Sequence, residues 1–167
     1  MIDEKIRRTN RVLYATIIII LIGFLDALYL LYMELTNQFY CPINIGKFQC
    51  VDVNTSNYAI FLGVHLSVWG VIYYLVMMLI SILAVRTKTE KNYWISFFLP
   101  FGAIWGAGFS IYLTILEAFF IGAYCEFCVL SAICSFIIFI LVVLAKIIFN
   151  GSLFRDLNFW NILKKEV

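Results

Sequence analysis

The chain has 167 residues, of which 64% are hydrophobic and only 13% are charged. Soluble globular domains carry roughly 25% charged residues, so this composition excludes an ordinary soluble domain. The sequence therefore predicts an integral membrane protein.

Four apolar stretches are long enough to cross a bilayer. A span needs about 20 residues, because backbone polar groups in hydrocarbon must pair within their own helix. The stretches cover residues 12–34, 62–85, 93–116 and 125–145. The first is too long for the apolar region of a signal peptide, and no A-x-A-type cleavage site follows it. We expect an all-α integral membrane fold, a four-transmembrane-helix bundle formed by residues 1–150.

The basic residues predict how these spans are oriented. Four lysines and arginines precede the first span, three lie between the second and third, and four follow the fourth. Of the 12 basic residues, Lys47 alone lies in the loop between the first two spans. Because cytoplasmic loops are enriched in lysine and arginine, both termini are expected in the cytoplasm. The loop at residues 35–61 and the link around Gly122 are then expected to face outward.

The five cysteines follow this division. Cys41 and Cys50 lie in the first outward loop, and Cys125 and Cys128 lie at the outward mouth of the fourth span. These four are expected on the oxidising side of the membrane. Cys134 lies deeper in the same span, and we interpret it as a small buried hydrophobic residue.

Three interpretations fit the four outward cysteines. A zinc site usually combines two short spacings, whereas eight residues separate Cys41 from Cys50. Two structural disulfides are compatible with the outward compartment. Redox chemistry is favoured by the Cys-x-x-Cys pair, because a helix N-terminus stabilises thiolate, the species that attacks disulfides.

The fourth span also predicts a pocket. Cys128, Ser131, Ala132 and Ser135 fall on one helical face, which is small enough to leave room for a flat electron acceptor. Aromatic residues of the other spans are candidates to line that pocket. They are Trp69, Tyr73, Trp105 and Tyr112.

The order of these features resembles the vitamin K epoxide reductase family, and its bacterial and archaeal members in particular. The resemblance rests on Cys41-Pro42 with Cys50, on VDVNTSNYAIFLGVHLSVWGVIYY at residues 51–74, and on CEFC at the start of the fourth span. It covers residues 23–144. The other bacterial quinone-linked disulfide oxidase has its Cys-x-x-Cys in the first outward loop, the reverse of this order.

The resemblance implies a role for each outward cysteine. Cys125 and Cys128 would be the active-site pair, with Cys128 facing a quinone. Cys41 and Cys50 would be shuttle cysteines, of which Cys41 meets an external partner and Cys50 passes electrons to Cys125.

It also implies that residues 54–62 form a short helix over the site, with Ser56 near the quinone. Two positions depart from the family pattern. Ala132 stands where vertebrate members have tyrosine, which argues against vitamin K epoxide itself as the substrate. His65 replaces the proline common after Gly63 in prokaryotic members.

Many prokaryotic members carry a fused thioredoxin-like domain after the last span. Only 23 residues follow residue 144 here, so no such domain is expected. Residues 151–167 place apolar side chains at helical spacing with Lys164 and Lys165 close by. This tail is predicted to be a cytoplasmic interfacial helix.

Two of the acidic residues within or beside the spans are weighed for a role, Asp26 and Glu117. Asp26 is the only charged residue between residues 12 and 33 and is expected to face the bundle interior. It is a candidate proton relay beside the quinone, with a structural carboxyl as the alternative. Glu117 is expected to be solvated.

The sequence thus predicts a membrane thiol:quinone oxidoreductase that drives disulfide formation outside the cytoplasm. Its expected cofactor is a quinone of the menaquinone or ubiquinone type. Its expected partners are a thioredoxin-like oxidase of DsbA type and membrane lipid, with no nucleic acid. The alternatives are a quinone or vitamin K epoxide reductase and a non-enzymatic tetraspan protein with structural disulfides.

Overall fold

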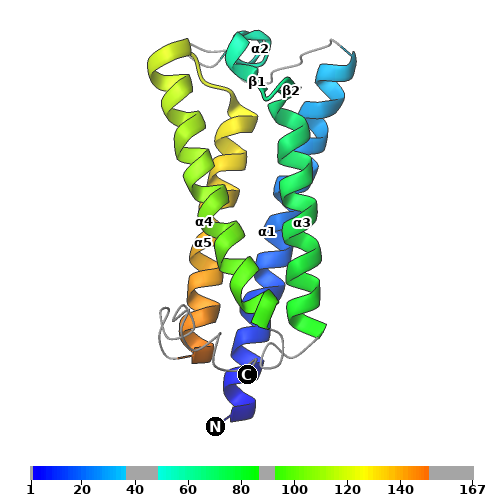
Figure 1. Cartoon of the computed structure of the whole chain (residues 1–167), viewed down its shortest axis with the longest axis vertical. Helices are drawn as coiled ribbons and strands as arrows, with labels where there is room; N and C mark the ends of the chain where they lie inside the picture. The colour runs from blue at the N-terminus through cyan, green and yellow to red at the C-terminus, as the bar shows by residue number, and fades with distance from the viewer. Residues whose placement is uncertain (1, 37–48, 87–92, 151–167) are drawn as a thin grey trace, which may run out of the picture.

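Four long helices run side by side along the molecule (Figure 1). The computed structural model describes residues 2–36, 49–86 and 93–150. The long helices are α1 (Ile2–Thr36), α3 (Leu66–Arg86), α4 (Tyr93–Ile115) and α5 (Glu126–Asn150). The segments long and apolar enough to cross a membrane are Arg7–Thr36, Leu66–Arg86, Trp94–Ile121 and Glu126–Ile148. The predicted four-transmembrane-helix bundle is confirmed.

The bundle is a ring of four helices around one apolar core. Helix α1 packs on α3 and α5, and α4 packs on the same two helices. Large apolar side chains such as Ile18, Leu79 and Ile140 point out of the bundle, as expected for helices surrounded by lipid rather than water. The most deeply buried residues of this core are Leu13, Ile20, Tyr74, Met77, Ala84, Ala103, Ile138 and Val142.

One end of the bundle is covered by the segment between α1 and α3. Its described part contains α2 (Cys50–Thr55), the 3₁₀ turn η1 (Asn57–Ala59) and a two-stranded hairpin of β1 (Ile60–Phe61) and β2 (Val64–His65). Figure 1 shows this segment at the end opposite the start of α1. We call residues 49–65 the cap.

The hairpin corrects two expectations from the sequence. The second span begins at Leu66 rather than at residue 62, and the helix of the cap covers Cys50–Thr55 rather than residues 54–62. The reason is a tight turn in which Leu62 and Gly63 both have positive φ, 55° and 78°. Such a two-residue turn reverses the chain and matches the twist of an antiparallel pair, so a helix cannot run through it.

A second local irregularity ends the third span. After α4 the chain continues as a π-helical turn, η2 (Leu116–Ile121), so the span extends past the predicted end at residue 116. Gly122 stops it with φ of 73°, and its N–H donates to the carbonyl of Glu117 at 2.9 Å. π turns are rare in proteins overall, but many of them occur at functional sites. This one leads directly to the Cys-x-x-Cys pair.

Glycines let the helices approach closely around α3. A methyl group at Gly23 of α1 would overlap the ring of Tyr74, which is fully buried. In α4, a methyl group at Gly106 would overlap the hydroxyl end of Tyr73. The small residues therefore give two α3 tyrosines room to turn into the bundle.

The first prediction concerns this contact. Gly23→Ala should destabilise the bundle by about 1–3 kcal/mol, because the added methyl group must displace the Tyr74 ring. Gly108→Ala is the matched control, since no atom lies within 4 Å of a methyl group at that position. Unfolding in mixed micelles should show a loss for the first variant and none for the second. Equal effects would contradict the packing described here.

Candidate active site

Cys125 caps the N-terminus of α5. Its carbonyl accepts the first helical hydrogen bond, from the N–H of Val129 at 2.9 Å. Its sulfur accepts the N–H of Cys128 at 3.4 Å. This is the geometry of an N-cap side chain, with sulfur in the place usually taken by a serine or aspartate oxygen. The positive end of the helix thus faces the sulfur.

This position changes the acidity of the thiol. Hydrogen bonding from the Cys128 side chain is the main influence that lowers the pKa of Cys125 below its ordinary value. The N–H of Cys128 and the amide of Asn54 lower the pKa further, while burial and the charge of Glu117 oppose them. The net direction favours thiolate, the form that attacks disulfides.

The cap closes over this sulfur. Cys125 is 0% exposed and packs in a buried cluster with Cys50 and Val53 of α2. The Nδ2 atom of Asn54 lies 3.6 Å from the Cys125 sulfur and donates to the Cys50 carbonyl at 2.9 Å. Gln49 N–H donates to the carbonyl of residue 124 at 3.1 Å, which fixes the start of α2 beside the Cys-x-x-Cys pair.

The cysteines differ in redox state. Cys50 is disulfide-bonded, which removes it from the thiolates available to a zinc ion. Cys125, Cys128 and Cys134 are free thiols, and Cys134 is buried as expected. Cys41 lies outside the described residues, so its predicted role stays a prediction.

A large apolar cavity of about 820 Å³ lies below the cap. The small face of α5 forms one wall, as the sequence predicted, and Cys128 stands at its upper end. The hydroxyl of Tyr74 holds this face by hydrogen bonds to the carbonyl of Ser131 and to the Ser131 and Ser135 hydroxyls, at 2.9, 2.9 and 3.3 Å. A cavity of this size and lining suits a flat, apolar ligand.

The cavity also includes most of the predicted ligand contacts. Ser56 reaches it from the cap, Ala132 from α5, and Trp69 and Tyr73 from α3. Trp105 of α4 lines it as well.

Two predicted contacts do not line the cavity. Tyr112 is 49% exposed, because it lies off the α4 face that carries Gly106, Phe109 and Leu113 into the cavity. Asp26 is buried but separated from the cavity, and neither of its carboxyl oxygens has a hydrogen-bond partner among the described residues. Neither residue lines this cavity, and their predicted ligand contacts stay predictions.

Glu117 is a site residue that the sequence analysis missed. It was expected to be solvated, but only 5% of it is exposed and it lines the cavity. Its carboxyl interacts with the thiol of Cys128 and with the backbone of Cys125. The π turn η2 is what carries Glu117 to this place, and no pattern of apolar residues indicates a π turn in advance.

Comparisons with known proteins identify one family. Residues 14–143 match the model of the vitamin K epoxide reductase family. The chain is also similar to "Thiol-disulfide oxidoreductase LTO1" of Arabidopsis thaliana, with 34% identity over 132 residues. The match covers 70% of this chain and 32% of the Arabidopsis protein.

The structure is thus a membrane bundle with a Cys-x-x-Cys pair between a cysteine-bearing cap and an apolar cavity. The family match covers most of the bundle, including all four spans in whole or in large part. The chain belongs to the vitamin K epoxide reductase family.

The second prediction concerns the acidity of Cys125. The midpoint is the pH at which alkylation of Cys125 by iodoacetamide reaches half of its plateau rate. An ordinary thiol has its midpoint at about pH 8.5, and Cys125 should have its midpoint at a lower pH because its pKa is lowered. Cys128→Ala removes the main stabilising donor and should move this midpoint upward. Cys134→Ala, which changes a distant buried thiol, should leave it in place. The reduced protein is labelled over a pH series and Cys125 is read by peptide fragmentation. An unchanged midpoint in Cys128→Ala would refute the assignment.

Proposed function

We propose that the protein is a thiol:quinone oxidoreductase that oxidises a thioredoxin-like partner and passes the electrons to a quinone. The observation that carries this proposal is the division of the Cys-x-x-Cys pair between two environments. The Cys125 sulfur lies under the cap beside Asn54 and Cys50, whereas Cys128 borders the apolar cavity. One sulfur is thus placed for disulfide exchange and the other for a lipid-soluble oxidant.

The electron path follows from disulfide exchange. The partner dithiol reduces a disulfide between Cys41 and Cys50 and leaves with its own disulfide. The thiolate of Cys50 then attacks Cys125 in the Cys125–Cys128 disulfide, and Cys128 leaves as a thiolate. The thiolate of Cys41 then attacks Cys50 in the Cys50–Cys125 disulfide, so Cys125 leaves as a thiolate and the Cys41–Cys50 disulfide is restored. In the structure Cys50 is disulfide-bonded, and Cys125 and Cys128 are free thiols.

The last step also moves protons. Oxidation of the Cys125–Cys128 dithiol to its disulfide releases two electrons and two protons, and reduction of a quinone to a quinol takes up both. Glu117 is the buried carboxyl that contacts the Cys128 thiol, so we assign it the role of proton acceptor. A quinone of the menaquinone or ubiquinone type fits the apolar lining and has Ser56, Trp69 and Tyr73 within the same cavity.

The cap is proposed to face the outside of the cell membrane. Described basic residues lie near the start of α1, at the end of α3 and near the end of α5, and these ends are opposite the cap (Figure 1). They are Arg7, Arg8 and Arg11 in α1, Arg86 in α3 and Lys146 in α5. The rule that basic residues stay in the cytoplasm then directs the cap outward. A DsbA-type oxidase is the partner class that would meet a shuttle disulfide there.

The third prediction tests the electron path. Purified protein given dithiothreitol and a quinone should reduce the quinone, followed by its absorbance. Cys128→Ala should abolish this activity, because Cys125 can no longer form the disulfide with Cys128 whose two electrons go to the quinone. Purified without dithiothreitol, this variant should accumulate a Cys50–Cys125 disulfide, because the Cys125 thiolate attacks Cys50 in its disulfide with Cys41 and Cys41 leaves as a thiolate. The product is seen as a crosslinked peptide by non-reducing mass spectrometry. Cys134→Ala should retain activity. Quinone reduction by Cys128→Ala at the unmutated rate, or a crosslink through Cys41, would refute the proposed division of roles.

The fourth prediction tests the orientation. Leu62 stands at the turn of the cap and is 78% exposed, while Arg7 lies exposed at the other end of the bundle. A membrane-impermeant maleimide should label Leu62→Cys in intact cells and Arg7→Cys only after permeabilisation. The opposite pattern would place the cap in the cytoplasm.

A further inference from the structure

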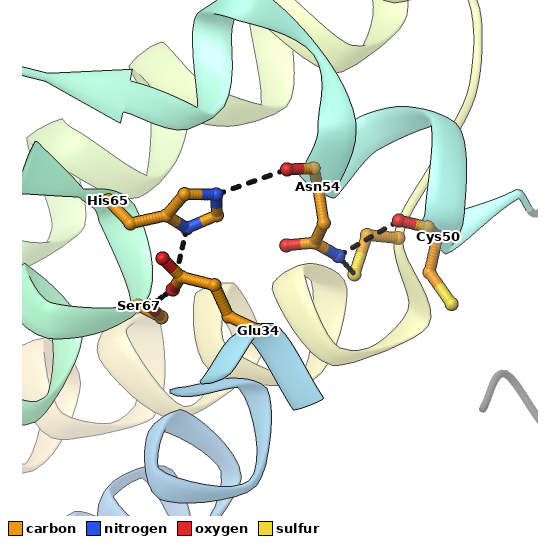
Figure 2. A network of polar contacts seen from close by, with 6 residues as sticks. Glu34, Cys50, Asn54, His65 and Ser67 are labelled. Atoms are coloured by element: carbon orange, nitrogen blue, oxygen red, sulfur yellow. Dashed lines mark hydrogen bonds and ion pairs between the residues drawn. The ribbon is translucent and has the colours of Figure 1, made fainter. Parts of the chain in front are cut away.

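His65 joins the cap to the bundle through both nitrogens of its ring. Its Nδ1 atom lies 3.0 Å from the Oε2 atom of Glu34, near the end of α1. Its Nε2 atom lies 3.1 Å from the backbone carbonyl of Asn54, near the end of α2. Figure 2 shows the ring between these two groups, with Ser67 on the far side of the carboxylate.

The chemistry of this contact is directional. A backbone carbonyl and a carboxylate only accept hydrogen bonds, and a neutral imidazole carries one N–H. Nε2 therefore donates to the Asn54 carbonyl, and Nδ1 lies within ion-pair distance of the Glu34 carboxylate. The hydroxyl of Ser67 donates to the same Oε2 atom of Glu34, so the carboxylate is fixed from two sides.

The chain of contacts continues to the reactive sulfur. Asn54 accepts the hydrogen bond of His65 through its backbone carbonyl. The side-chain amide of the same residue lies between the Cys50 carbonyl and the Cys125 sulfur. Figure 2 shows the Asn54 amide on the opposite side of the residue from the His65 contact. The start of α2 is fixed by the bond from Gln49, so the His65 contact fixes the end that carries Asn54.

We propose that Glu34, His65 and the Asn54 carbonyl form a latch that keeps α2 closed over Cys125 and directs the Asn54 amide at its sulfur. His65 is then a positioning residue for the thiol exchange, although it touches neither cysteine. The latch controls how often Cys125 is uncovered and how well its thiolate is stabilised when covered. This inference rests on the proposed role of Cys125, but its test needs neither quinone nor partner.

The fifth prediction uses iodoacetamide labelling of Cys125 in the reduced, full-length protein over a pH series. The plateau rate at high pH reports access to the sulfur, and the midpoint reports stabilisation of the thiolate. His65→Ala should raise the plateau about fivefold or more, because a cap hydrogen bond is lost, and should move the midpoint up by about 0.5–1 pH unit. Glu34→Ala should act in the same direction. Glu34→Gln, which keeps an acceptor for His65, should give a smaller change.

Asn54→Ala separates the two effects. It keeps the backbone carbonyl that His65 binds but removes the amide, so it should move the midpoint upward and leave the plateau unchanged. The double variant Glu34→Ala/His65→Ala should change the plateau rate and the midpoint no more than His65→Ala alone, because both changes open the same latch. Val64→Ala, an exposed neighbour in the hairpin, is the control and should behave like the unmutated protein.

Two outcomes would overturn the latch. One is a plateau and a midpoint in His65→Ala that match those of Val64→Ala. The other is strict additivity of Glu34→Ala and His65→Ala, which would show that the two residues act independently. If the labelling results hold while quinone reduction is absent, the latch stands and the proposed function fails.

Discussion

The arrangement of this protein depends on the hydrogen bond from the N–H of Cys128 to the sulfur of Cys125. The first turn of any helix has N–H groups without partners inside the helix. In a membrane protein these N–H groups cannot face hydrocarbon without a partner, so the first turn of the helix needs a hydrogen-bond acceptor. Here the acceptor is a reactive sulfur, and the same hydrogen bond that completes the first turn of α5 also favours the thiolate. Stability of the span and reactivity of the thiol therefore share one contact.

The two sulfurs of the pair lie in different environments because α5 runs from the cap into the bundle. The N-cap position holds Cys125 at the end of the bundle, where α2 and the hairpin cover it. Three residues later, Cys128 lies at the upper edge of the apolar cavity. The π turn before the pair brings Glu117 to the boundary between the two environments. In the proposed function, thiol exchange, proton transfer and contact with the quinone have adjacent but distinct places.

The cap is held by polar contacts that belong to this chain's own residues. The resemblance to prokaryotic family members places proline where this chain has His65. A proline has no donor and could not join Glu34 to the Asn54 carbonyl as His65 does. The side chains of His65 and Glu34 are only 16% and 26% exposed, and polar contacts in such partly buried places are stronger than in bulk water. That setting gives a short cap helix an anchor that its six residues could not supply alone.

The sequence by itself determined the membrane bundle, the place of the Cys-x-x-Cys pair and the small face of α5. These features depend on local composition and helical periodicity, which the bilayer enforces on every span. Tertiary structure decided the rest. The turn at Leu62 and Gly63 shortened the second span, the π turn buried Glu117, and the rotation of α4 turned Tyr112 away from the cavity. Such features depend on contacts between residues far apart in the chain, as between Glu34, His65 and Asn54, and no periodic pattern encodes them.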